Sequence, residues 1–266
     1  MSRVAVCTDS TSLLTSDEAA AAGVAVVPAT VVVDGDARDE PEVDLDAFYE
    51  SLAGGARATT AQPAPGRLLA AYEGAAAAGA AAVVSVHLDP RLSGTVDAAR
   101  LAARDAPIPV LVVDTGTASR AVAIVALWAA ARAAEGASAA EIAAGAPSVA
   151  AAIDNAFFAT GAARGRIATS DGALLRLKDG RASVVAACAA GEAAGAIAAR
   201  LPQGEPLAVA VGHAHRAVAD AADALARQLA ALPDVEATSR YRVGASVGAH
   251  AGPWTFGAFW HPLQLG

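Results

Sequence analysis

Cysteine and charge are both scarce in this chain of 266 residues. Cys7 and Cys188 are the only cysteines, and two cysteines cannot form the disulfide framework that stabilises small secreted domains. Both are expected to behave as small hydrophobic residues in a reducing compartment. Charged residues make up 17% of the chain and hydrophobic residues 55%, and this balance excludes intrinsic disorder. The sequence therefore predicts one or two domains with a substantial core.

Basic runs and long apolar spans are also missing. Lys178 is the only lysine, the formal net charge is −8, and no basic stripe could follow a phosphate backbone. The N-terminus lacks the apolar core of a signal peptide. The longest uncharged stretch, residues 243–266, carries five glycines and two prolines, so it cannot form the helix of about 20 residues that spans a bilayer. These features predict a cytoplasmic protein with no nucleic-acid partner and no integral membrane span.

Short apolar runs alternate with helical stretches in the first half of the chain. The apolar runs, which are typical of buried strands, are Val4–Cys7, Val24–Val33, Val83–Val86 and Val110–Val113. The helical stretches are Asp17–Ala22, Asp46–Leu52, Pro65–Ala78, Ser93–Arg104, Ala118–Glu135 and one opened by the capping box from Ser138 to Glu141. This alternation predicts a parallel sheet with helices on both faces and a ligand site at the carboxyl ends of its strands.

The pattern changes after about residue 150. The segments Arg164–Ile167 and Leu174–Val185 suggest a hairpin, with a turn at Asp179-Gly180. A helix (Ala193–Arg200), a strand (Leu207–Val211), a helix (Ala217–Leu232) and glycine-punctuated strand (Tyr241–Trp260) follow. The predicted fold is α/β, with an N-terminal parallel-sheet α/β/α domain (1–150), a second α+β domain (151–266) and a ligand pocket between them.

Three polar segments fall where this fold predicts a binding site. The first is residues 59–65, a polar and proline-rich entry to a helix. The second is Leu92-Ser93-Gly94-Thr95, where we expect Ser93 to be the N-cap of a helix whose free N–H groups form an anion site. The third is residues 248–253, with His250 between glycines in the last predicted strands.

Together these segments resemble motifs of the DegV family. Asp9-Ser10-Thr11 resembles TDST, Thr60–Pro63 resembles TSQP and Leu92–Thr95 resembles LSGT. Further along the chain, Val113-Asp114-Thr115 with Ser119 resembles VDS…S, Gly165-Arg166-Ile167 resembles GGRI and Gly248–Pro253 resembles GTHTGP. Each match is short, but they keep their order and span nearly the whole chain. The chain differs from the family pattern at Trp254, where glycine is common, and in a shorter segment around residues 167–190.

The resemblance implies a bacterial fatty-acid-binding protein. Family members bury the acyl chain between two domains and present the carboxyl group to a separate fatty acid kinase. Carried over by motif, Thr60, Ser93 and His250 would bind the carboxylate. The supporting residues would be Gly94, Thr95, Ser119, Arg166 and His213. The resemblance thus implies a carrier for a long-chain fatty acid, with no metal, no cofactor and no catalytic residue, and we expect the shortened segment to affect kinase docking more than lipid binding.

Physical chemistry agrees with such a site. An unpaired carboxylate in an apolar environment costs several kcal/mol, so it needs hydrogen-bond donors. Two hydroxyls, helix N–H groups and an imidazole supply these donors without a permanent buried cation. An alkyl tail then contributes about 0.8 kcal/mol of affinity for each buried CH₂ group.

The residues leave other functions open. Ser93 and His250 could serve a hydrolase of lipid esters, although no Gly-x-Ser-x-Gly elbow is present and no acid is obviously placed to orient His250. The sheet would also suit a nucleotide- or phosphate-binding protein, but no glycine-rich phosphate loop follows the first strand. Each residue also has a purely structural interpretation: Ser93 as a helix cap, Thr60 as a loop hydroxyl, and His250 and His213 as histidines that hydrogen-bond the surrounding fold.

Overall fold

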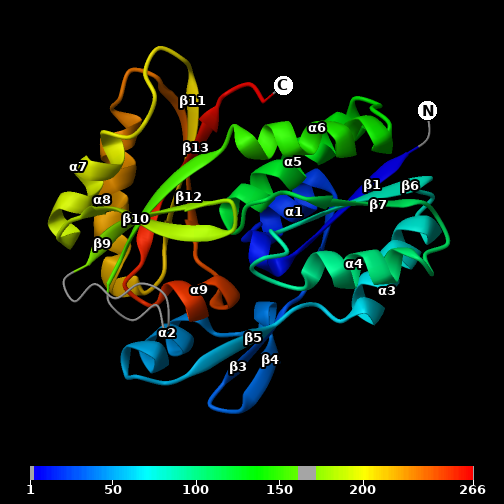
Figure 1. Cartoon of the computed structure of the whole chain (residues 1–266), viewed down its shortest axis with the longest axis horizontal. Helices are drawn as coiled ribbons and strands as arrows, with labels where there is room; N and C mark the ends of the chain where they lie inside the picture. The colour runs from blue at the N-terminus through cyan, green and yellow to red at the C-terminus, as the bar shows by residue number, and fades with distance from the viewer. Residues whose placement is uncertain (1–2, 161–171, 266) are drawn as a thin grey trace. The chain divides into compact units, whose positions relative to one another are not determined.

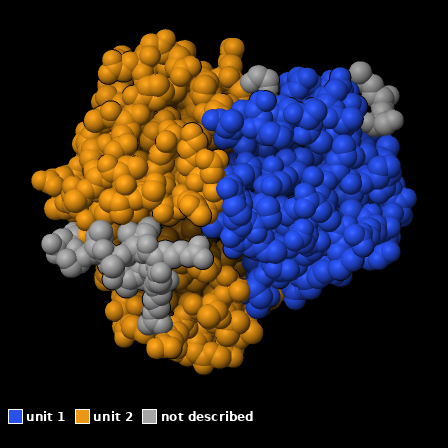
Figure 2. Space-filling model, in the orientation of Figure 1, with its two compact units in different colours: residues 1–30, 61–151, 266 blue, residues 31–60, 152–265 orange. Residues whose placement is uncertain are grey.

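The computed structural model describes residues 3–160 and 172–265. Contacts divide the chain into two compact units, coloured separately in Figure 2. Unit 1 consists of residues 1–30, 61–151 and 266, and unit 2 of residues 31–60 and 152–265. The two-domain interpretation of the sequence had assigned residues 31–60 to the first domain, whereas their contacts place them in unit 2.

Unit 1 is built on a four-stranded parallel sheet. Its strands lie in the order β2-β1-β6-β7, and every neighbouring pair runs parallel. Their bounds are β1 Val4–Asp9, β2 Val24–Val27, β6 Ala82–His87 and β7 Val110–Asp114. The predicted run Val24–Val33 is interrupted at Pro28, which has no N–H for a sheet ladder, and Thr30–Val33 forms a separate strand, β3.

Helices cover both faces of this sheet, as Figure 1 shows. Helices α3 and α4 lie on one face and α5 and α6 on the other. Their bounds are α3 Pro65–Ala77, α4 Thr95–Ala103, α5 Arg120–Ala134 and α6 Ala139–Ala151; α1 spans Ser16–Ala22. The capping box predicted from Ser138 to Glu141 is present, with the Glu141 carboxylate 2.8 Å from the Ser138 backbone nitrogen. These observations confirm the predicted α/β architecture of the N-terminal part.

Unit 2 contains a mixed six-stranded sheet in the order β10-β9-β8-β13-β11-β12. The bounds are β8 Asp154–Ala159, β9 Ala173–Lys178, β10 Arg181–Ala187, β11 Leu207–His213, β12 Val235–Arg242 and β13 Phe256–Pro262. The β9–β10 hairpin turns at Asp179-Gly180 as predicted. The predicted strand Arg164–Ile167 lies outside the described residues.

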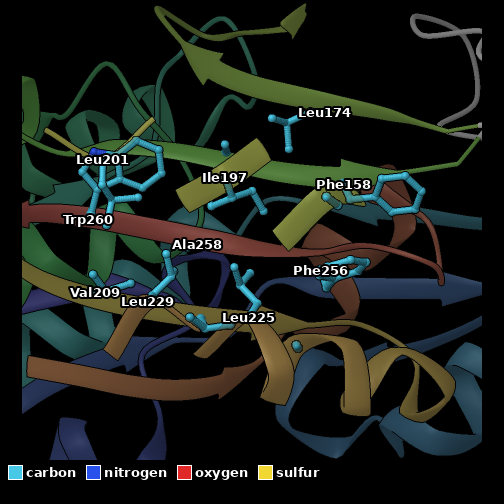
Figure 3. Packing of buried hydrophobic residues seen from close by; sticks show 14 of the residues in the cluster. Phe158, Leu174, Ile197, Leu201, Val209, Leu225, Leu229, Phe256, Ala258 and Trp260 are labelled. Atoms are coloured by element: carbon cyan, nitrogen blue, oxygen red, sulfur yellow. The ribbon is translucent and has the colours of Figure 1, made fainter. Parts of the chain in front are cut away.

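Two helices, α7 (Ala190–Ala198) and α8 (Ala219–Ala230), pack on this sheet and form the core of unit 2. Figure 3 shows Ile197, Leu225 and Leu229 gathered with the strand residues Phe158 and Phe256. All five side chains are almost completely buried, and each such residue contributes roughly 1.5–3 kcal/mol. None of the helices in the described part of the chain has the length and apolarity needed to cross a membrane.

Residues 31–60 belong to unit 2 because of specific polar bonds. The segment contains β3, β4 (Asp36–Asp39), α2 (Leu45–Ala53) and β5 (Ala58–Ala61). The hydroxyl of Tyr49 donates to the Val243 carbonyl at 2.8 Å. The Glu40 carboxylate accepts two bonds of 2.8 Å from Ser246. These partners lie about 200 positions later in the chain, so local sequence patterns could not reveal them.

One predicted strand is wrong in its middle. The segment Tyr241–Trp260 contains a helix, α9 (Ala245–Ala251), between β12 and β13. The glycines that suggested open strand have another role here. Gly248 lies directly against the Tyr49 ring, and a Cβ at this position would collide with that ring. Gly248 therefore permits close packing of α9 on α2.

Candidate functional site

Thr60 and His250 lie side by side in unit 2. Thr60 is in β5 and His250 in the last turn of α9, and 3.1 Å separates the Thr60 Oγ1 from the His250 Nε2. Thr60 is half-buried and His250 is exposed. Nearby protein atoms still remove enough water to lower the pKa of His250 below its ordinary value. The pair thus offers an accessible hydroxyl and a neutral imidazole.

Ser93, Gly94 and Thr95 open helix α4 in unit 1. The prediction that Ser93 is the N-cap is wrong, because α4 begins at Thr95 and Gly94 is the cap. The Gly94 carbonyl accepts the first intrahelical bond, from the Ala98 N–H at 2.9 Å, and no side chain caps the helix. The Ser93 Oγ lies instead 2.8 Å from the Thr95 Oγ1. The first turn of α4 therefore presents hydroxyls beside N–H groups that no cap side chain engages.

The loop before Ser93 is held by Asp89. The Asp89 carboxylate accepts the Arg91 backbone N–H at 2.7 Å and is also bound by the Arg91 guanidinium. The hydrogen bond from that guanidinium lowers the pKa of Asp89, so the carboxylate stays charged and the turn stays closed. Within the Leu92–Thr95 segment, Gly94 lies so close to the Gln62 side chain that a Cβ on residue 94 would collide with that side chain. Two of the predicted ligand segments therefore meet in unit 1.

Ser119 occupies the turn between β7 and α5. Its backbone has a φ of 61° and a ψ of −145°, a region that L residues rarely adopt, and the residue is 8% exposed. Its side chain makes no capping bond to α5. Such a conformation costs on the order of 1–3 kcal/mol, and strained residues of this kind cluster at functional sites.

His213 lies at the end of β11, next to Arg240 of β12. The Arg240 guanidinium lies 3.3 Å from the His213 Nδ1. Burial, together with Arg240 and Arg242, lowers the pKa of His213 to about 4. Within the described residues, no three His, Cys, Asp or Glu side chains group as a metal site. Arg166 lies outside the described residues.

A buried polar chain in unit 1 went unnoticed in the sequence. The Tyr72 hydroxyl lies 2.9 Å from the Ser85 Oγ, which lies 2.7 Å from the His87 Nε2. The His87 Nδ1 lies 2.6 Å from the Asp9 carboxylate. All four residues are completely buried. The signal was available: Ser85 and His87 are two residues apart in an apolar strand, and Asp9 ends the neighbouring parallel strand.

This buried hydrogen-bond network has the residue types of a catalytic triad, but Ser85 cannot act as a nucleophile as it stands. Its hydroxyl is buried and engaged by both Tyr72 and His87. The buried network has a structural role at its Asp9 end, because the Asp9 carboxylate also accepts the Thr11 N–H at 3.1 Å. The network thus fixes the turn after β1, at the point where the strand order of the sheet reverses.

Comparison with known proteins finds matches over nearly the whole chain. The family model described as "Uncharacterised protein, DegV family" matches residues 3–263. The chain belongs to the DegV family. A DegV domain-containing protein of Streptomyces coelicolor is 35% identical over 277 residues, covering 97% of this chain and 98% of that protein.

Solved DegV structures share the fold throughout. A DegV family protein from Thermus thermophilus, described as fatty acid binding, has a TM-score of 0.86 and 28% identity, covering 98% of this chain and 100% of that chain. DegV from Bacillus subtilis, described as a fatty acid binding protein, has a TM-score of 0.86 and 25% identity over the same shares of the two chains. The predicted DegV resemblance and the two-part α/β fold are therefore confirmed.

Proposed function

We propose that this DegV-family chain binds a long-chain fatty acid and holds its carboxylate with Thr60, Ser93 and His250. The observation that carries the proposal is the full-length similarity to DegV proteins described as fatty acid binding. In this proposal the chain is a carrier that acts in the cytoplasm, with Gly94, Thr95, Ser119, Arg166 and His213 in supporting roles. Its two free thiols, Cys7 and Cys188, suit a reducing compartment.

The local geometry supports this choice of residues. A carboxylate only accepts hydrogen bonds, and the hydroxyls of Thr60 and Ser93 and the N–H groups at the start of α4 can all donate.

The test begins with the lipid that the protein carries. The purified chain is denatured and extracted, and any released lipid is identified by mass spectrometry. We expect a free fatty acid, and we expect S93A and T60V to carry less of it. After refilling, each variant should bind about tenfold or more weakly, because each loses a charge-assisted hydrogen bond of about 1.5–3 kcal/mol.

The matched control is S183A, which removes an exposed hydroxyl from β10. It should keep the lipid content of the wild type. Equal lipid content in S93A, T60V and the wild type would contradict the proposed residues. A covalent acyl adduct in the intact mass of the protein would instead favour the hydrolase. Delivery of the carboxyl group to a separate kinase is the finer part of the proposal, and a reconstituted phosphorylation assay tests it.

A further inference from the structure

His250 is the member of the Thr60–His250 pair that can change its charge near neutral pH. We propose that carboxylate binding at this pair takes up a proton at His250, so that the protein captures its ligand more tightly as the pH falls. This inference concerns the regulation of the same site and rests on the proposed function.

Several charged groups around α9 bind residues other than His250. Glu40 binds Ser246 in the first turn of the helix, one turn before His250. Tyr49 of α2 lies against Gly248. Two further ion pairs on neighbouring elements are Arg242–Asp46 and Arg216–Glu50. Among the described residues, therefore, burial is the cause that lowers the pKa of His250.

Two opposing effects act on the imidazole in the free protein. The carbonyl groups at the C-terminal end of α9 favour a positive charge on His250, which lies in the last turn. Desolvation favours the neutral ring. Burial lowers the pKa of His250 below its ordinary value, which favours the neutral ring in the free protein at neutral pH.

A bound carboxylate reverses this balance. A negative charge within hydrogen-bond distance raises the pKa of an imidazole, so the complex binds more protons than the free protein at pH values between the two pKa values. By linkage, the affinity then rises as the pH falls, by at most about tenfold per pH unit. An ordinary carboxyl group stays ionised above about pH 5, so its own titration does not intervene between pH 8 and pH 6.

Hydrogen bonding leads to the same expectation. One hydrogen lies between the Thr60 Oγ1 and the His250 Nε2 in the free pair. A carboxylate requires a donor from each residue. The Thr60 hydroxyl can rotate toward the ligand. If the His250 Nε2 accepted the hydrogen bond from that hydroxyl, the imidazole must then change tautomer or gain a proton before it can donate to the carboxylate. A gained proton gives a charge-assisted bond, which is roughly twice as strong as a neutral one.

The experiment is calorimetric titration of the delipidated full chain with dodecanoate, below the concentration at which this probe forms micelles. Affinity is measured from pH 8 to pH 6, and at pH 7 in phosphate and in Tris, whose different ionisation heats reveal proton uptake. We expect the affinity to rise more than about threefold from pH 8 to pH 6, with an uptake between zero and one proton. H250Q keeps a donor but cannot titrate, so it should still bind dodecanoate with no uptake and no pH slope.

The controls separate this inference from the proposed function. H261Q removes a histidine of β13 whose Nδ1 contacts the Pro262 carbonyl at 2.7 Å, and it should keep both the slope and the uptake. T60V should weaken binding but keep the uptake. Binding without proton uptake in the wild type, or an unchanged slope in H250Q, would overturn the inference and leave the fatty-acid site standing. A chain that binds no dodecanoate at any pH would overturn both.

Discussion

Asp9 and His87 form a close side-chain contact in the interior of unit 1. Both side chains are completely buried, and His87 lies 2.6 Å from the Asp9 carboxylate. Removing His87 would leave the buried Asp9 carboxylate without this partner, and breaking a buried pair in this way typically costs about 3–5 kcal/mol. We therefore expect H87A to lower the free energy of unfolding by about that amount, as measured by urea denaturation.

The comparison variant is S85A, which leaves the contact between Asp9 and His87 in place. It breaks the hydrogen bonds that Ser85 makes with His87 and Tyr72. Its expected cost is about 1–3 kcal/mol. If H87A cost no more than S85A, the Asp9 carboxylate would have to be satisfied by other groups, and the importance we give to this contact would be mistaken.

At the scale of elements, the packing of α9 on α2 positions His250. Gly248 lies against the Tyr49 ring, and the Tyr49 hydroxyl binds the Val243 carbonyl just before α9. Adding a methyl group to a packed contact forces the neighbours apart at a typical cost of about 1–3 kcal/mol. G248A should therefore destabilise the protein by that amount and weaken fatty-acid binding, as measured by thermal unfolding and by lipid content.

The control for this variant is G191A, at a helical position of α7 where a Cβ meets no atom within 4 Å. Alanine favours helix over glycine by about 1 kcal/mol, so G191A should be neutral or stabilising. An equal loss of stability in both variants would show that the Tyr49 contact has no special role.

Elements with local signals could be predicted, and elements fixed by distant contacts could not. Helix α3 starts at Pro65 as predicted, and the β9–β10 turn lies at Asp179-Gly180. Residues 245–251 pack against Tyr49, nearly 200 positions earlier, and no local pattern reveals this contact, so their glycines suggested strand instead. The N-cap of α4 is Gly94 and not the predicted Ser93, because the Gly94 carbonyl accepts the first hydrogen bond of the helix. Thr60 and His250 were chosen by motif alone, and their 3.1 Å contact needed the fold.

At the scale of the whole molecule, acid should destabilise the protein in two stages, one from each unit. In unit 2, the pKa of His213 is lowered to about 4 by burial and by Arg240 and Arg242. The unfolded chain therefore binds a proton at His213 that the folded chain does not, and stability falls as the pH drops from 6.5 to 4. His213 is partly exposed, so solvent screening limits this contribution to about 1 kcal/mol.

In unit 1, Glu18 acts at lower pH. Burial alone would raise the pKa of Glu18, but hydrogen bonds from Arg120 and Thr15 outweigh it and lower the pKa to about 2. A depressed carboxyl pKa stabilises the fold above 4.5, and this stabilisation disappears as the pH falls toward 2. The Arg120 Nη1 lies 2.7 Å from the Glu18 carboxylate, which is 31% exposed, so about 1–2 kcal/mol is at stake after screening.

Urea denaturation of the wild type, H213Q, E18Q and the double variant from pH 7 to pH 3 tests both stages. H213Q should match the wild type at pH 7 and become the more stable of the two below pH 6, because glutamine takes up no proton. E18Q should be less stable than the wild type at pH 7, and this difference should shrink below pH 4.5, because Glu18 of the unfolded chain takes up a proton there that the folded protein does not. The two residues belong to different units and bind different partners, so their effects should add in the double variant. A difference between E18Q and the wild type that stayed constant down to pH 3 would refute the assignment of the lower stage to Glu18, since only a group that titrates in that range can produce it.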